Sequence, residues 1–125
     1  MIKGAENQEK YLSHLKAIKD DDCQQAFHYM IGSAATMPGF ECFPTHHGII
    51  PDFQYHNKNE CLFAFIPNQQ WLLFYFRKPA LKRPQYSRET VLKRFPDAKE
   101  NKNGELTLRV SDIDQARKLV EFLSK

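Results

Sequence analysis

The sequence lacks several features that mark particular classes of protein. No hydrophobic run approaches the roughly 20 residues that a membrane-spanning helix needs, and residues 1–10 are polar, without the apolar region of a signal peptide. All five glycines are isolated, which argues against a glycine-rich phosphate loop. We therefore expect a soluble, cytoplasmic protein with no membrane partner.

Cysteine is scarce, and its spacing indicates no cross-link. Cys23, Cys42 and Cys61 form no Cys-x-x-Cys motif, and an odd number of cysteines cannot all pair within one molecule. The chain is therefore expected to carry reduced thiols. Three aspartates, residues 20–22, directly precede Cys23 and oppose any lowering of its pKa, so a structural thiol is favoured over a nucleophile.

What the sequence does contain is enough apolar material for one core. The chain has 125 residues, of which 42% are hydrophobic and 26% are charged. A chain of this size and composition buries roughly two thirds of its unfolded surface and folds without stabilising cross-links such as disulfides. Residues 1–125 are expected to form a single domain.

Apolar residues recur at helical intervals in four segments. Serine and aspartate at the starts of these segments are suitable N-caps, and prolines stop two of them. The expected helices are 5–19, from Asp22 to the stop at Met37-Pro38-Gly39, 88–95 after Ser87, and 112–123 after Ser111.

Alternating or short apolar runs predict four strands, over residues 49–56, 61–66, 71–76 and 105–110. The first three are joined by connections too short for parallel pairing, so they form an antiparallel meander. Residues 40–48 are interpreted as an irregular loop or a short edge strand, and 78–86 as a loop. The order ααβββαβα predicts an α+β domain with a mainly antiparallel four-stranded sheet packed on helices.

Both faces of the strand 71–76 are apolar. Trp71, Leu73 and Tyr75 share one face, and Leu72, Phe74 and Phe76 share the other. One face can rest on helices. The face with Trp71, Leu73 and Tyr75 is then either ordinary core, a homodimer interface or a ligand groove.

Positive charge is concentrated in one segment. The formal net charge is +3, but residues 77–94 alone carry +6, which leaves −3 for the remainder. Such a segment attracts nucleic acid or an acidic protein partner, unless it is simply a solvated surface. The candidate contact residues are Arg77, Lys78, Lys82, Arg83, Tyr86, Arg88, Lys93 and Arg94. Among them, Tyr86 offers an aromatic ring that can stack on a base.

No metal, cofactor or catalytic residue is predicted. The five histidines include no helical i, i+4 pair. His46 and His47 point to opposite sides of an extended chain, and Asp52 lies about 13 Å from His56 along a strand. These four residues remain the candidates for a metal or small-ligand pocket, as the weakest alternative.

One resemblance to known families is carried by scattered motifs from Pro38 onward. These are Pro38-Gly39-Phe40-Glu41 after a helix, Leu62-Phe63-Ala64-Phe65 within the meander, and a helix from Ser87 to Phe95-Pro96. In these features the chain resembles small bacterial proteins of the YjbR/MmcQ type and, to a similar degree, the DUF1801 and DUF5655 groups. The resemblance implies an α+β fold and, for the YjbR group, a suggested role in DNA binding; it carries over no catalytic residue.

The sequence thus leaves three functional hypotheses. The first is a small, non-enzymatic binding or accessory protein that engages nucleic acid or an acidic partner through residues 77–94. The second is a structural or regulatory homodimer, and the third is a small-ligand or metal-binding enzyme that uses the His/Asp cluster.

Overall fold

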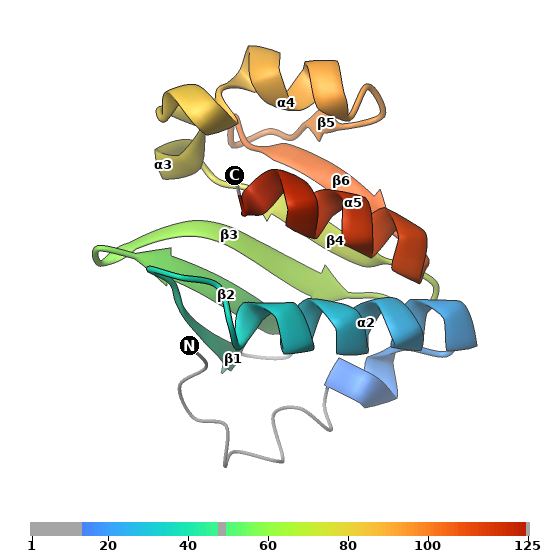
Figure 1. Cartoon of the computed structure of the whole chain (residues 1–125). Helices are drawn as coiled ribbons and strands as arrows, with labels where there is room; N and C mark the ends of the chain where they lie inside the picture. Colours follow the sequence, from blue (N-terminus) through green and yellow to red (C-terminus); the bar gives the residue numbers. More distant parts are fainter. Residues whose placement is uncertain (1–13, 48–49, 125) are drawn as a thin grey trace.

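The computed structural model describes residues 14–47 and 50–124, and Figure 1 shows their arrangement. Element labels follow that figure, and a helical turn at residues 14–17 precedes the first labelled element. The order along the chain is α2 (Asp21–Ala34), β1 (Glu41–His47), β2 (Ile50–Asn57), β3 (Glu60–Pro67), β4 (Leu72–Phe76), α3 (Lys78–Leu81), a 3₁₀ turn (Pro84–Tyr86), α4 (Arg88–Arg94), β5 (Lys99–Glu100), β6 (Leu106–Val110) and α5 (Ile113–Leu123).

The strands form one six-stranded sheet in the order β1-β2-β3-β4-β6-β5. Every neighbouring pair is antiparallel. Lys58 and Asn59, both with positive φ, make the tight turn between β2 and β3, a conformation that asparagine tolerates better than most residues. The antiparallel α+β architecture is therefore confirmed, with more strands than the sequence predicts.

One face of the sheet carries the aromatic core. Phe65 lies between Phe53 of β2 and Phe74 of β4, and Phe63 lies between Tyr55 and Phe76, so large rings oppose one another across three strands. Because side chains alternate along a strand, these positions all point to the same side.

Helices α2 and α5 lie side by side on this face (Figure 1). The ring of Phe27 in α2 meets Phe65 edge-on, with 6.0 Å between centroids. The ring of Phe122 in α5 meets Phe76 in the same way at 6.1 Å. Sheet and helices thus share a single hydrophobic core.

Of the three predicted N-cap residues, two differ from the observed caps by one or two positions. Asp20, not Asp22, caps α2, and its carboxylate accepts from the Cys23 N–H. Asp112, not Ser111, caps α5 by accepting from the Gln115 N–H. Ser87 caps α4 as predicted. In each case, the carboxylate or hydroxyl used lies three residues before the N–H that it satisfies.

The predicted strand count of four is wrong: of the two interpretations of residues 40–48, the edge strand is the one that the structure shows, as β1, and β5 has no sequence pattern of its own. β1 contains Pro44, which argues against a strand, but β1 lies at the sheet edge, where a missing N–H is tolerated. β5 has only two residues and exists because it pairs with β6. The predicted loop at 78–86 contains α3 and the 3₁₀ turn instead.

The four predicted strands appear as β2, β3, β4 and β6, each within one or two residues of its expected bounds. For the predicted first helix, residues 5–13 lie outside the described part of the chain, and 14–17 are helical. In the described ranges, no helix is both long and apolar enough to cross a membrane.

Candidate functional site

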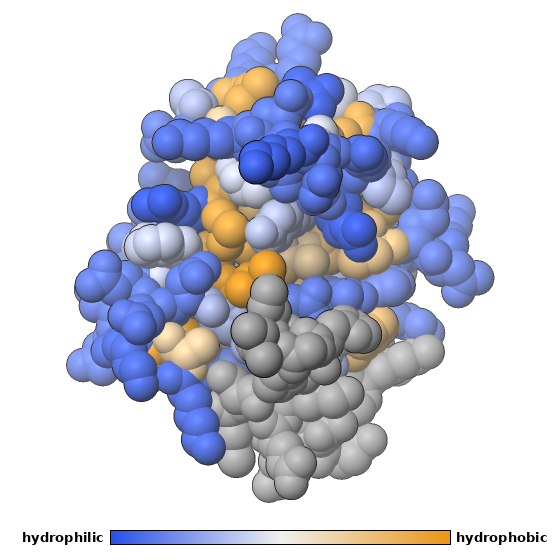
Figure 2. Space-filling view, turned by 180° about the vertical axis from the view of Figure 1, so that it is seen from behind, coloured by the Kyte–Doolittle hydropathy of each residue, from blue (hydrophilic) through white to orange (hydrophobic). Residues whose placement is uncertain are grey.

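The face of the sheet opposite the helices carries the residues whose role the sequence left open. Trp71, Leu73 and Tyr75 are half-buried there, on the side away from the buried Leu72, Phe74 and Phe76, as strand parity predicts. Figure 2 views the molecule from this side, where hydrophobic residues show through the middle of a largely hydrophilic surface. A homodimer through these residues stays a prediction.

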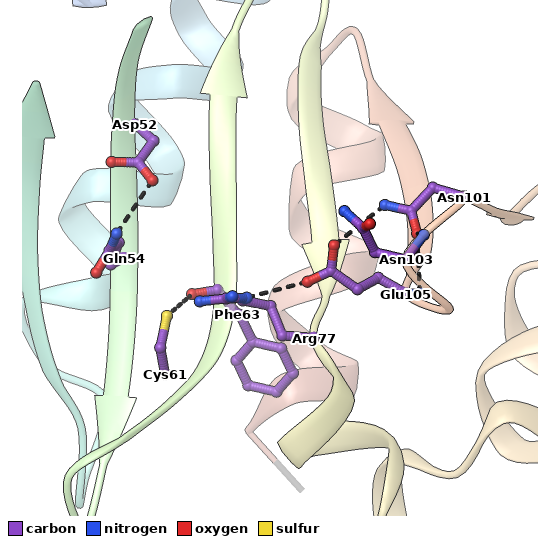
Figure 3. Close-up of polar contacts among 8 residues, drawn as sticks. All are labelled: Asp52, Gln54, Cys61, Phe63, Arg77, Asn101, Asn103 and Glu105. Carbon is purple, nitrogen blue, oxygen red and sulfur yellow. Dashed lines mark hydrogen bonds and ion pairs between the residues drawn. The ribbon is translucent and has the colours of Figure 1, made fainter. Parts of the chain in front are cut away.

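A row of polar side chains crosses this face (Figure 3). Glu105 lies just before β6 and is buried, with only 8% of the residue exposed. Its carboxylate accepts from Arg77 Nε at 3.0 Å and from Asn101 Nδ2 at 3.1 Å. The buried carboxylate therefore has charged and neutral donors, which offset its desolvation.

Cys61 lies beside Arg77 in the same row. Its Sγ donates to the Phe63 carbonyl at 3.4 Å. Burial raises the pKa of the Cys61 thiol, and the neighbouring Arg77 guanidinium lowers it by less. Burial likewise raises the pKa of Cys23 to about 11 and that of Cys42 to about 12. All three cysteines are therefore protonated thiols at neutral pH, unlike the thiolate that a nucleophilic site requires.

The residues of the histidine hypothesis are only partly connected. Asp52 and His56 are joined through Gln54, whose Nε2 donates to Asp52 Oδ2 at 3.1 Å and whose Oε1 lies 2.9 Å from His56 Nε2. The side chains of His46 and His47 lie outside the described part of the structure. Among the described residues, no group of three or more His, Cys, Asp or Glu side chains could hold a metal ion.

All four arginines of the basic segment 77–94 are paired with glutamates. Arg77 pairs with Glu105 at 3.0 Å, Arg83 with Glu60 at 3.5 Å, and Arg88 with Glu100 at 2.8 Å. Arg94 has a looser partner in Glu121, at 3.8 Å. The lysines of the segment, Lys78, Lys82 and Lys93, are exposed.

Tyr86 is not a surface residue. It is 4% exposed, its ring meets Phe63 edge-on with 5.0 Å between centroids, and its hydroxyl donates to the Leu123 carbonyl at 2.7 Å. The 3₁₀ turn directs this ring into the core. In this structure Tyr86 is therefore unavailable for stacking on a base.

A different set of cations does converge, around an open cleft of about 1050 Å³ beside β6. We call it the edge cleft. It lies at the start of β5, between β6, the segment 94–99 and the first turns of α5. The charged residues that line it are Arg94, Lys99, Arg109, Lys118 and Asp97, so cations outnumber acids four to one.

Sequence reasoning found only Arg94 of these four cations. Lys99, Arg109 and Lys118 belong to three consecutive elements, β5, β6 and α5, and they lie about ten residues apart along the chain. The one available signal was the alternation in β6, which placed Arg109 on the outer face of its strand. Their convergence depends on the pairing of the two-residue β5 with β6 and on the position of α5, neither of which has a local sequence pattern that reveals it.

Comparison of the chain with protein-family models, with curated proteins and with solved structures gives no significant match. The resemblance to YjbR/MmcQ-type proteins therefore stays a prediction.

Proposed function

We propose that the protein is a non-catalytic binding domain that takes an anionic partner in the edge cleft. The observation that carries this proposal is the convergence of Arg94, Lys99, Arg109 and Lys118 around one opening, where Asp97 is the one acidic residue among the described residues that line it. Like charges gathered at a concave surface raise the local potential and attract acidic groups.

The cleft cations differ from the other arginines in how far they are neutralised. Arg77 and Arg88 hold glutamates at 3.0 and 2.8 Å, distances typical of charge-assisted hydrogen bonds. In the cleft, Arg94 is 3.8 Å from its glutamate. Arg109 places its guanidinium over the Trp71 ring, 4.2 Å from the centroid, and has no ion pair within 4.0 Å among the described residues. These cations thus keep more of their charge for a partner.

Binding is favoured over catalysis because of the state of the candidate nucleophiles. Burial raises the pKa of the thiols of Cys23, Cys42 and Cys61, which keeps them protonated. The proposal therefore retains the binding role suggested by the charge pattern and locates it at the edge cleft, with Arg94 common to both.

The proposal is tested with two double variants that remove equal charge. Lys99→Gln with Lys118→Gln alters the cleft, whereas Lys82→Gln with Lys93→Gln alters only the basic segment outside it. Fluorescein-labelled hexaglutamate and a labelled dT10 oligonucleotide serve as anionic probes in fluorescence anisotropy. We expect the cleft variant to weaken binding of whichever probe binds by about five- to twentyfold, and the segment variant to change it by less than about twofold.

The salt dependence gives a second measurement, since binding through exposed charges weakens as screening increases. Wild-type protein that binds neither probe at low salt would contradict the proposal. A segment variant that loses more affinity than the cleft variant would move the binding surface to residues 77–94.

A further inference from the structure

We propose that the partner in the edge cleft is an extended acidic peptide segment that adds a strand to β6. This inference rests on the proposed function and specifies its partner. Addition of a strand requires unpaired backbone groups at a sheet edge, together with side-chain contacts that select the sequence.

The backbone of β6 offers such an edge at Arg109. β5 pairs with β6 only at Lys99–Thr107 and Glu100–Leu106, whereas β6 continues to Val110. The Asn101 N–H donates to the Glu105 carbonyl, which shows that the backbone groups of Glu105 point away from β4. The direction in which the backbone N–H and carbonyl point alternates from residue to residue along a strand. The N–H and carbonyl of Thr107 and of Arg109 therefore also point away from β4.

On the N-terminal side of Lys99, the chain turns away from the edge of the sheet. Residues 96–97 form a turn, and the Ala98 N–H donates to the Phe95 carbonyl rather than to β6. The N–H and carbonyl of Arg109 therefore face the cleft where the next strand would lie, and no hydrogen bond to them is found among the described residues outside the sheet ladders.

The cleft cations lie on both sides of this edge. Arg109 points to the open face of the sheet, as does Lys99, which pairs directly with Thr107. On the helix side, Lys118 projects from α5, and Arg94 is held towards α5 by Glu121. Successive side chains of an added strand point to opposite sides, so an acidic peptide meets a pair of cations on each.

A peptide fits this edge better than a nucleic acid does. The hydrogen-bonding partner of Arg109 must supply both an acceptor for the N–H and a donor for the carbonyl, as a peptide backbone does. A phosphodiester backbone supplies acceptors for the cations but no donor for the carbonyl. The edge of β6 exposes few backbone groups, so the cleft cations contribute most of the affinity. The exposed backbone groups of β6 favour an extended peptide over other anions.

The decisive experiment separates the charge of Arg109 from its backbone N–H. Arg109→Gln removes the charge and keeps the N–H; Arg109→Pro removes both. Because this N–H points away from β4, proline breaks no ladder hydrogen bond with β4. Circular dichroism checks that both variants fold, and anisotropy with labelled hexaglutamate measures binding. We expect Arg109→Pro to bind about three- to tenfold more weakly than Arg109→Gln.

Hydrogen exchange on the wild-type protein tests the same contact without a substitution. At a hexaglutamate concentration nine times the dissociation constant, exchange of the Arg109 amide should slow about tenfold. The Thr107 amide, which points to β5 within the existing ladder, serves as the internal reference.

The outcomes distinguish this inference from the proposed function. Equal binding by Arg109→Gln and Arg109→Pro, with no protection of the Arg109 amide, overturns strand addition while the cleft remains an anion site. Tighter binding of dT10 than of hexaglutamate overturns the peptide assignment in favour of nucleic acid. If neither probe binds, both proposals fail, and the cations serve only to keep other sheet edges away.

Discussion

Phe63 is the residue on which most of the core converges. Its ring lies 5.9 Å from Phe40, 5.7 Å from Phe74 and from Phe76, and 5.0 Å from Tyr86. It is fully buried, and its neighbours come from β4, from the 3₁₀ turn and from the segment before β1. Because protein interiors are close-packed, removal of this ring leaves a cavity among its neighbours.

Substitution of Phe63 by alanine should therefore lower the free energy of unfolding by about 3–5 kcal/mol, from lost burial and the cavity that remains. Urea unfolding followed by circular dichroism measures the change. Leu92→Ala is the control, because Leu92 is 36% exposed and its loss should cost less than about 1 kcal/mol. A similar loss of stability in the two variants would show that Phe63 has no special position.

Cys23 makes stability depend on alkaline pH. Burial, with a smaller contribution from Asp20, raises its pKa from 9.0 to about 11. A folded-state pKa above the unfolded value stabilises the protein fully below about pH 9, and this stabilisation is lost as the pH rises through 11.

Between pH 9 and 11, the unfolding free energy of the wild type should therefore fall more steeply than that of Cys23→Ala. Urea titrations at intervals of half a pH unit measure both slopes. Parallel slopes would mean that the thiol has the same pKa in the folded and unfolded chains.

At the scale of the element, α2 depends on a single cap. Asp20 accepts from the Cys23 N–H at 3.0 Å, while Asp21 and Asp22 lie in the first turn and are exposed. All three carboxylates favour the positive end of the helix, but among the described residues only the Asp20 carboxylate accepts from one of its free N–H groups.

Asp20→Ala should consequently destabilise the protein by about 1 kcal/mol. Asp22→Ala removes the same charge and should cost about half as much or less. Thermal unfolding measures both changes. A larger loss in Asp22→Ala would restore Asp22 as the cap that the sequence predicts.

The elements that the sequence predicts are those with a periodic pattern of their own. β2 and β6 alternate, β3 and β4 are short apolar runs, and α5 carries an apolar stripe, so each can be found locally. β1, with Pro44 in it, and the two-residue β5 become strands only because a neighbour pairs with them. Local patterns hold no information about such partners.

The candidate site could be predicted even less well. Counting charge along the chain identified residues 77–94, but Arg77, Arg83 and Arg88 are paired with glutamates from other elements. Lys99 and Lys118 are ordinary surface lysines by sequence, and they line one cleft only because β5 pairs with β6 and α5 lies beside this edge.

At the scale of the whole molecule, the sheet and both long helices stabilise one core. α2 and α5 pack against each other as well as on the sheet, and their buried residues belong to the same cluster. Such a molecule is expected to unfold as a single cooperative unit.

Leu119→Ala in α5 removes a fully buried side chain and should destabilise the protein by about 2–5 kcal/mol. Native-state hydrogen exchange should then show the most protected amides of α2 and β3 losing protection by the same factor. Unchanged protection in α2 would mean that this helix opens independently of α5.

The contact between Trp71 and Arg109 has a practical consequence. Trp71 is the sole tryptophan of the chain, and the guanidinium over its ring lies 4.2 Å from the centroid. Arg109 also lines the edge cleft. A ligand that draws this cation away from the indole changes the electric field at Trp71. The fluorescence emission spectrum of the unlabelled protein therefore reports whether the cleft is occupied.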